Sequence, residues 1–202
     1  MSVEKRQRLS VCRDLIIEIV SIGFICFVSL LLVSISSFFE IMLFFAIGFI
    51  AFGLLEYFIH RFVFHLRIKK EPYRKWVYDI HGVHHKYPSD QRFYKTSIYL
   101  KIALVLAINI IGYSTGGGHG LIFSSGFGSG YAFYLFVHYI VHHYNAPKNS
   151  LKFFWVYHEI HHHINPKNAY GVSNPFWDMV FQTYPRGQEF TMANRRLKNH
   201  LK

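Results

Sequence analysis

Apolar residues dominate four long stretches of the chain, and polar residues collect between them. The apolar stretches cover residues 15–39, 41–59, 97–113 and 121–140. An α-helix needs about 20 apolar residues to cross the hydrocarbon core of a bilayer, so the pattern predicts four transmembrane helices. Glu40 lies between the first two stretches and predicts a tight turn, and glycines at positions 116–118 predict a turn between the last two. The predicted fold class is therefore an all-α membrane protein built from two helical hairpins.

The composition agrees with a membrane setting. Of the 202 residues, 51% are hydrophobic, and the mean hydropathy is +0.18, which is too apolar for an ordinary soluble domain with so little charge. The first apolar stretch is longer than the core of a cleavable signal peptide and has no small-residue cleavage site after it, so we expect it to remain as a span. We expect one integral membrane domain over residues 1–202.

Lysine and arginine mark one side of the predicted bundle. They collect before the first stretch, between the second and third, and after the fourth, whereas the tips of both hairpins lack them. Cytoplasmic loops carry the excess of basic residues, so both termini and the central connection are predicted to be cytoplasmic, at a bacterial inner membrane or the endoplasmic reticulum. This topology, with anionic headgroups, explains the formal net charge of +11 better than nucleic acid does, because no nucleic-acid recognition motif accompanies the charge.

Twelve of the 14 histidines lie in four dense clusters at the ends of the predicted spans or just after them. The predicted topology brings all four clusters to the cytoplasmic side. Neutral imidazole is the commonest metal ligand in proteins, so the clusters predict a metal site. The clusters are His60-x4-His65, His81-x2-His84-His85, His138-x3-His142-His143 and His158-x2-His161-His162-His163.

The number of histidines indicates two metal ions. A structural zinc takes four ligands and a catalytic zinc about three, so ten or more histidines exceed what one zinc ion uses. Imidazole-rich pairs of metals with open positions suit iron and oxygen activation, although the residues alone leave zinc open. Residues 76–86 and 151–164 are expected to be helical, which would give the histidines of the second and fourth clusters a shared face.

The four clusters resemble the ordered histidine boxes of the membrane fatty acid hydroxylase superfamily, which includes sterol desaturases. Within it the chain is most similar to the fatty acid 2-hydroxylases, over residues 49–184. The first two boxes correspond to Leu55-Glu56-Tyr57-x2-His60-Arg61-x3-His65 and His81-Gly82-x-His84-His85-x2-Pro88. The third and fourth correspond to His138-Tyr139-x2-His142-His143 and Tyr157-His158-x2-His161-His162, followed by Tyr170-Gly171-Val172-Ser173 and Phe176-Trp177-Asp178-x2-Phe181-x-Thr183.

The resemblance implies four membrane spans and a cytosolic helical cap that holds two irons. The enzyme would hydroxylate a lipid C–H bond with O2, at the 2-position of a fatty acid or of a fatty-acyl chain in a membrane lipid. Zinc could replace iron on purification. By matching positions, the implied metal ligands are His60, His65, His81, His84, His85, His138, His142, His158, His161 and His162.

Other polar residues near the boxes are candidates for supporting roles. His143 and His163 are further candidates as ligands or as neighbours of ligands. Carboxylates can accept the second ring N–H of a metal-bound histidine, which makes Glu56, Asp79, Glu159 and Asp178 candidates for orienting the ligands. His119 and His200 are expected to lie outside the site. Gln182 departs from the family pattern, which commonly has glycine there.

The resemblance also has implications for the partners. The sequence shows no cytochrome b5 domain with its His-Pro-Gly-Gly motif, so a separate electron donor is expected, such as cytochrome b5 or a ferredoxin with its reductase. The other expected partners are the lipid substrate and the membrane.

Three other interpretations fit parts of the pattern. A sterol or carotenoid desaturase or hydroxylase would share the metal chemistry. His158-Glu159-x2-His162 matches the HExxH motif of zinc metalloproteases, in which the glutamate is the general base, but this interpretation leaves three histidine clusters unexplained. A metal carrier or transporter would bind its cargo near the membrane midplane, whereas these histidines lie at the ends of spans.

Overall fold

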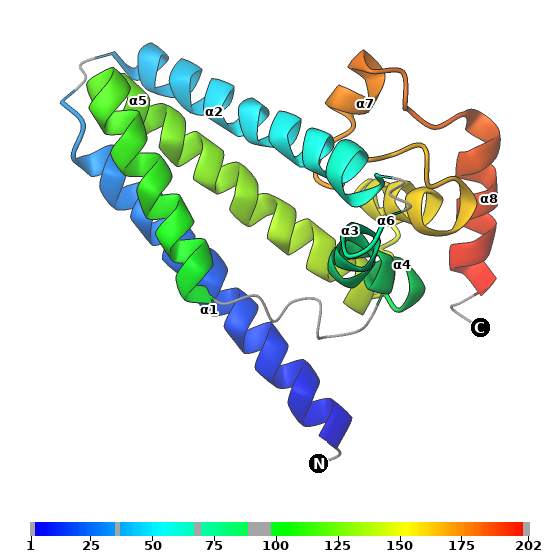
Figure 1. Ribbon diagram of the computed structural model, residues 1–202. Helices are drawn as coiled ribbons and strands as arrows, with labels where there is room; N and C mark the ends of the chain where they lie inside the picture. The colour runs from blue at the N-terminus through cyan, green and yellow to red at the C-terminus, as the bar shows by residue number, and fades with distance from the viewer. Residues whose placement is uncertain (1–2, 35–36, 67–69, 89–97, 200–202) are drawn as a thin grey trace. The chain divides into compact units, whose positions relative to one another are not determined.

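The structure is a computed structural model that describes residues 3–34, 37–66, 70–88 and 98–199. Helices make up most of the described residues, which contain no strand, so the predicted all-α class is confirmed (Figure 1). The π-helical elements are labelled η. In chain order the elements are α1 (Val3–Leu31), α2 (Phe38–Phe58), η1 (Ile59–Phe64), α3 (Tyr73–Val77), η2 (Tyr78–Gly82), α4 (Val83–Lys86), α5 (Ile98–His143), α6 (Lys152–Glu159), η4 (Ile160–Ile164), α7 (Phe176–Val180) and α8 (Gly187–Asn199).

Among the described residues, three helices are long and apolar enough to cross a membrane: Ser10–Leu31, Phe38–Phe64 and Ile98–His143. The sequence predicts four spans because it divides the last of these at its glycines. The structure shows a break at that point, where Gly117 has φ 56° and ψ −135°, although the helix continues directly on both sides. A positive φ is readily adopted by glycine but costs other residues energy, so Gly117 permits the chain to reverse there.

The two arms of α5 pack against each other after the break at Gly117 (Figure 1). A Cβ atom at Gly112 would lie 2.5 Å from the carbonyl oxygen of Gly120, so the backbones meet where neither residue has a side chain. The hydroxyl of Ser124 donates to the carbonyl of Ile108 on the opposite arm at 3.0 Å. Small residues permit such close approach between helices in lipid, where van der Waals packing and hydrogen bonds replace the hydrophobic effect.

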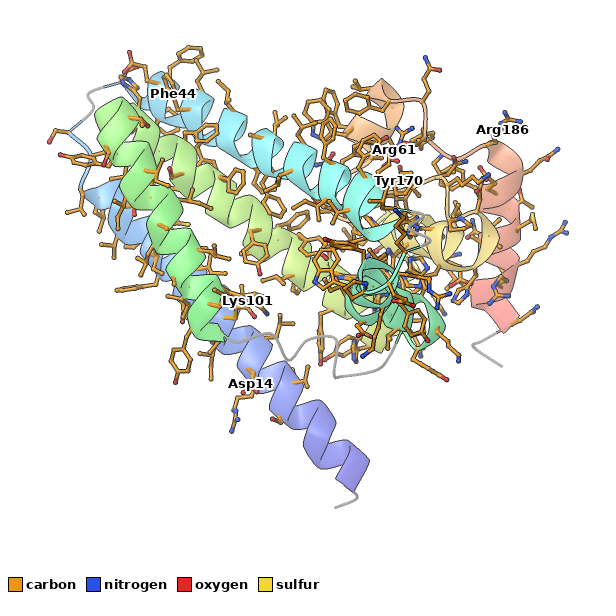
Figure 2. The ribbon with its side chains drawn as sticks, viewed as in Figure 1. Asp14, Phe44, Arg61, Lys101, Tyr170 and Arg186 are labelled. Carbon is orange, nitrogen blue, oxygen red and sulfur yellow. The ribbon has the colours of Figure 1, made fainter. Side chains whose placement is uncertain are left out.

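The chain divides into two compact units, of which the first comprises Met1–Phe52 and Gln91–Phe136. Its interior includes a buried ion pair in which Lys101 Nζ of α5 lies 2.9 Å from Glu18 Oε2 of α1 (Figure 2). The Lys101 side chain is only 11% exposed, so it lies inside this unit. Large apolar side chains such as Phe24 and Ile110, 65% and 66% exposed, cover the outside, as expected for helices that face lipid.

The second unit comprises Gly53–Asp90 and Val137–Lys202 and contains all four histidine clusters. Elements α3, η2 and α4 follow one another without interruption, as do α6 and η4, which confirms the helices expected over residues 76–86 and 151–164. The helix α8 packs on α6 and η4 around Val156, Tyr157, Ile160 and Ala193, joined by partly buried Phe190. This small core holds the segment with the last histidine cluster in position.

Candidate metal centre

Three of the four histidine clusters overlap short π-helical turns. In η1 the amide of His65 donates to the carbonyl of His60 at 3.2 Å, an i→i+5 bond that brings residues five apart onto one face. An ordinary α-helix would turn these two side chains in different directions. The second and fourth clusters overlap η2 and η4, and in η4 the amide of Asn165 donates to Ile160 at 2.7 Å. These local turns are part of how the chain aims its imidazoles.

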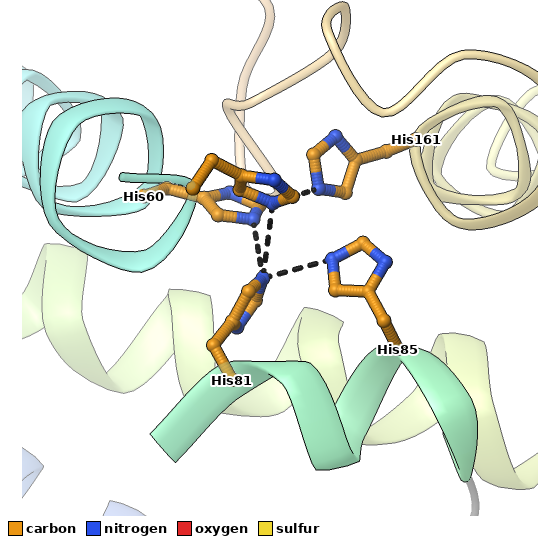
Figure 3. Close-up of side chains that lie close together, drawn as sticks. His60, His81, His85 and His161 are labelled. Carbon is orange, nitrogen blue, oxygen red and sulfur yellow. Dashed lines mark hydrogen bonds between the residues drawn. The ribbon is translucent and has the colours of Figure 1, made fainter. Parts of the chain in front are cut away.

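Five histidines form the first of two groups that could hold a metal ion, with ligand atoms all within 4.8 Å of one another. They come from three clusters that are distant in sequence, and their Nε2 atoms face one another (Figure 3). The Nε2–Nε2 distances are 3.1 Å for His60 and His81, 3.2 Å for His81 and His65, 2.9 Å for His85 and His81, and 2.9 Å for His161 and His65.

The other five form the second group, again with ligand atoms within 4.8 Å of one another. Nε2 of His84 lies 2.9 Å from that of His138 and 3.1 Å from that of His142, and His142 lies 2.7 Å from His158. His162 completes the group. The two groups adjoin each other, because the rings of His85 in the first and His162 in the second stack with centroids 4.3 Å apart. The ten implied ligands therefore divide into two neighbouring sets of five.

The outer ring nitrogens fix the tautomers of two histidines in the first group. Nδ1 of His60 lies 2.5 Å from the carbonyl oxygen of Tyr170, and Nδ1 of His161 lies 2.8 Å from that of Asn168. A carbonyl can only accept, so both Nδ1 atoms carry the proton and both Nε2 atoms present a lone pair to the centre of the group. A hydrogen bond at the second nitrogen is the usual way in which proteins orient a metal-binding imidazole.

Burial favours the neutral form of the implied ligands that lie outside the candidate spans. It lowers the pKa of His65 to about 4 and, with the charge of His65 as the next cause, that of His85 to about 3. The metal-binding form of histidine is the neutral one, so a lowered pKa makes the lone pairs available near pH 7. Burial first, and then neighbouring imidazoles, also lower the pKa of His81, His84, His158, His161 and His162.

The spacing of the imidazole nitrogens in the two groups is explained better by bound metal ions than by hydrogen bonds between the imidazoles. Each neutral imidazole has a single N–H, and in His60 and His161 a backbone carbonyl already takes it. Nitrogens bound in adjacent positions to an ion with bonds of about 2.1 Å lie about 3 Å apart, close to the spacings seen here. Both ring nitrogens of His162 and Nδ1 of His158 are buried without a hydrogen-bond partner among the described residues. Such buried polar atoms require an explanation, and a metal would satisfy those that face it.

Comparison with known proteins agrees with this geometry. The sequence model of the family described as fatty acid hydroxylase matches residues 45–183. This chain belongs to the fatty acid hydroxylase family. It is 30% identical over 141 residues to the dihydroceramide fatty acyl 2-hydroxylase FAH2 of Arabidopsis thaliana, an alignment that covers 69% of this chain and 60% of the relative. It is 32% identical to the fatty acid 2-hydroxylase of Homo sapiens, covering 69% of this chain and 38% of that protein.

A solved structure also matches this member of the family. The structure titled full length scs7p, with only the hydroxylase domain visible, superposes with a TM-score of 0.66 at 26% identity, covering 82% of this chain and 62% of that one. The ceramide very long chain fatty acid hydroxylase scs7 of Schizosaccharomyces pombe is 32% identical over 155 residues, 69% of this chain and 42% of the relative. The chain thus spans between about two fifths and three fifths of the length of these relatives.

The carboxylates that were expected to orient the imidazoles have other partners in this hydroxylase-family chain. Glu56 accepts hydrogen bonds from the amide and the hydroxyl of Ser173. Asp178 is fully buried and accepts from the amides of Tyr170 and Gly171 at 2.9 and 2.7 Å. Both carboxylates hold the segment of residues 168–173, which supplies the carbonyls that receive the Nδ1 protons of His60 and His161.

The remaining candidates lie outside the two groups. Nδ1 of His143 donates to the carbonyl of Tyr139 at 3.0 Å. His163 lies 3.8 Å from Glu159, which accepts a bond from Arg196 at 2.6 Å. Asp79 is exposed.

His119 lies 3.3 Å from Glu40 in the first unit, and His200 is outside the described residues. The sequence could not predict that the carbonyls of Asn168 and Tyr170 orient His161 and His60, because every residue has a carbonyl and no side chain marks such a role.

The departure at Gln182 has a structural cost. Its φ is 59°, in the left-handed region that favours glycine, and the next residue, Thr183, donates its amide to the carbonyl of Asp178 at 2.8 Å. The hydroxyl of Thr183 donates to the carboxylate of Asp178 at 2.7 Å. The turn at Gln182 is therefore held by two bonds from Thr183 to Asp178 despite its left-handed backbone.

Arg61 lies over the ring of Tyr170, with its guanidinium carbon 5.8 Å from the ring centroid (Figure 2).

Proposed function

We propose that this protein is a non-haem di-iron oxidoreductase that hydroxylates a lipid C–H bond with O2, at the 2-position of a fatty acid or fatty-acyl chain. The observation that carries the proposal is the pair of adjoining groups of five imidazoles. Imidazole suits iron, zinc and copper, and the ten ligands exceed the needs of a single ion. Iron in both groups would supply the oxygen chemistry, in which one atom of O2 ends in the new hydroxyl group, the other in water, and an external donor provides two electrons.

The residues of the chain contribute position and a dry environment. His84 and His161 are fully buried, and His60, His81, His138 and His158 are at most 5% exposed, so these six rings are shielded from bulk water. The carbonyls of Tyr170 and Asn168 hold two rings with their lone pairs inward. Such preorganisation means that the ligands need no rearrangement when a metal binds.

The names of the relatives support the choice of substrate. Proteins 30–32% identical to this chain are a dihydroceramide fatty acyl 2-hydroxylase, a ceramide very long chain fatty acid hydroxylase and a fatty acid 2-hydroxylase. We infer the same reaction class here, with a separate electron donor such as cytochrome b5 or a ferredoxin with its reductase.

We further propose a single integral membrane domain with four spans. The break at Gly117 supports a count of four, because it divides α5 into two arms. Both termini and the histidine clusters would be cytoplasmic, as the distribution of basic residues predicts. Reporter fusions at the C-terminus and at Gly117 should report opposite sides of the membrane, and two reporters on one side would contradict the four-span topology.

Oxygen labelling tests the reaction. Cells that express the protein should gain lipids heavier by one oxygen, and that oxygen should come from labelled dioxygen. A hydrolase would take oxygen from water, and a desaturase would remove two hydrogens and add no oxygen. Lipids labelled from water, or lipids that only lose hydrogen, would therefore contradict the proposed hydroxylation.

Metal analysis tests the site independently of turnover. The purified protein should hold close to two metal ions. His84→Ala and His161→Ala should each lower metal content and abolish hydroxylation. His119→Ala is the matched control, because His119 contacts Glu40 in the first unit, and it should change neither. Bound zinc would be compatible with the proposal, since affinity alone does not select iron. Full activity without metal would contradict it.

Glu159 distinguishes the hydroxylase from a zinc protease. As the general base of an HExxH motif it would have to face a metal-bound water, but its carboxylate instead pairs with Arg196 at 2.6 Å and lies near His163. Glu159→Gln should therefore leave metal content near two and retain hydroxylation. Loss of a measured proteolytic activity on this single substitution would favour the protease interpretation.

A further inference from the structure

A cavity of about 510 Å³ adjoins the first histidine group within the second unit. Three members of that group, His65, His81 and His85, form part of its lining. Among the described residues, no histidine of the second group lines it. A molecule in this cavity therefore meets one histidine group only, and the two groups are not equivalent toward a ligand.

The rest of the lining is mainly apolar. Leu66, Val77 and Tyr78 contribute to the walls, and so does Phe64, whose ring stacks on that of His81 with centroids 4.9 Å apart. Such a cavity has the size and the character of a small-molecule site, with apolar walls and few polar groups. Its polar groups are mainly the imidazoles of the metal centre itself.

The lining of the cavity carries little charge. Arg74 is the only lysine, arginine or carboxylate among the described lining residues, and it already forms an ion pair with Glu71 at 2.7 Å. A phosphate or carboxylate would have to compete with that pair, whereas an alkyl chain would gain by leaving water. The gain is roughly 0.8 kcal/mol for each buried methylene.

We propose that this cavity binds the part of the acyl chain that extends beyond the hydroxylated carbon and presents that carbon to the first histidine group. The proposal rests on the function proposed above and deepens it. The occupant is an alkyl chain, because the walls are apolar, and its reacting end lies at the imidazoles, because three of them line the cavity.

Val77 and Gly82 both line the cavity. Val77 is partly buried and contributes its side chain to the wall. A Cβ at Gly82 would lie 2.6 Å from the ring of Tyr78, so the glycine permits that ring to stand where it does. Enlarging Val77 to tryptophan adds volume to the wall and replaces no histidine of either group.

The first arm of the experiment measures product chain length. Val77→Trp should lower 2-hydroxylated products of the longest acyl chains by about tenfold relative to the shortest, with close to two metals retained. Lys75→Trp is the matched control, because Lys75 is exposed on the same helix and is not part of the described lining, and its profile should match the wild type. An unchanged chain-length profile in a metal-loaded, active Val77→Trp would overturn the cavity proposal and leave the hydroxylase function intact.

The second arm does not depend on turnover or on the variant. A long-chain fatty acid with a diazirine a few carbons from its carboxyl end should label peptides that contain residues 77–78 in the wild-type protein. Excess unlabelled fatty acid should compete for this labelling. Labelling confined to other peptides would overturn the proposal even if Val77→Trp had failed to fold. If labelling occurs at residues 77–78 but no hydroxylated lipid forms, the proposed reaction fails and the acyl site stands.

Discussion

Replacing Asp178 by asparagine should remove metal from the first histidine group and spare the second. One carboxylate oxygen of Asp178 accepts from the amide of Tyr170 at 2.9 Å and from the hydroxyl of Thr183 at 2.7 Å, and the other accepts from the amide of Gly171 at 2.7 Å. Asparagine keeps the shape but turns one acceptor into a donor. Whichever way the new amide points, at least one buried backbone N–H faces another N–H.

The magnitude follows from these contacts. An unsatisfied buried donor costs about 1–3 kcal/mol, so the segment of residues 168–173 should shift away from Asp178. That segment supplies the carbonyls of Tyr170 and Asn168 to Nδ1 of His60 and His161, both in the first group. Losing such outer partners typically costs 10–100-fold in metal affinity, or about 1.4–2.8 kcal/mol. Both of these carbonyls accept from imidazoles of the first group, so the first group is the one that loses its outer partners.

Chelator competition measures the effect. At a chelator concentration at which the wild type keeps two metals, Asp178→Asn should keep about one. Asn194→Ala is the control for general loss of stability, because it removes a 2.6 Å bond with Lys152 between α6 and α8. It should leave both metals bound.

A double-mutant cycle identifies the group that is affected. Asp178→Asn should lower metal content further in a His138→Ala background, where only the first group is intact, and should add little to His60→Ala. Equal loss of metal from both groups, or no loss from either, would refute the assignment of Asp178 to the first group.

Two further predictions concern stability. Gln182→Gly should raise the melting temperature by about 2–4 °C, because relieving a left-handed residue is worth about 1 kcal/mol, whereas Gln182→Ala, which keeps a Cβ, should not; no difference between the two would contradict strain at φ 59°. In the metal-free protein, stability should fall as the pH falls below about 6.5. The folded-state pKa of His65 and of His85 is lowered to about 4 and about 3, so the unfolded state binds more protons in this window, at a cost of up to about 1.4 kcal/mol per pH unit for each such histidine. A metal-free melting temperature that is flat between pH 7 and 5 would show that these imidazoles are not kept neutral.

Much of the fold could be predicted from the sequence because membrane spans depend on composition. A run of apolar residues long enough to cross a bilayer has few alternatives to a helix, so four of the predicted boundaries fall within a few residues of the ends of α2 and α5. The end of the first span was wrong: it was expected at residue 39, but α1 ends at Leu31. Composition could not reveal this, because residues 32–39 are mostly apolar or small and carry no helix-breaking residue.

The position of the buried ion pair was also beyond sequence reasoning. From sequence alone, a lysine near the start of a span can either extend its side chain to the membrane surface or form an ion pair inside the bundle. Only the packing of α1 against α5 decides that Lys101 meets Glu18. The backbone carbonyls that orient His60 and His161 were unpredictable for a similar reason, since their role depends on the path of the 168–173 segment.

The division of the histidines between the two groups, in contrast, follows a rule that the sequence contains. Residues four apart share a helix face, whereas adjacent residues point roughly 100° apart. The structure follows this for pairs four apart, which share a group, and for adjacent pairs, which are split between groups. The pairs three apart, His81 with His84 and His158 with His161, were expected to share a face but are also split. The pairs four apart are His81 with His85, His138 with His142, and His158 with His162; the split neighbours are His84 with His85 and His161 with His162.

The five-residue spacing of His60 and His65 breaks this rule and is rescued by the i→i+5 bond of η1. A single turn of α-helix there would turn one of the two rings away from the first group. The ligand count of that group therefore depends on the π-helical turn η1, which arises where the apolar run of α2 gives way to the polar segment. The spacing cannot predict which histidine pairs from different clusters form one group, because that depends on how helices distant in sequence pack. His60 and His65 join His81, His85 and His161 through tertiary structure alone.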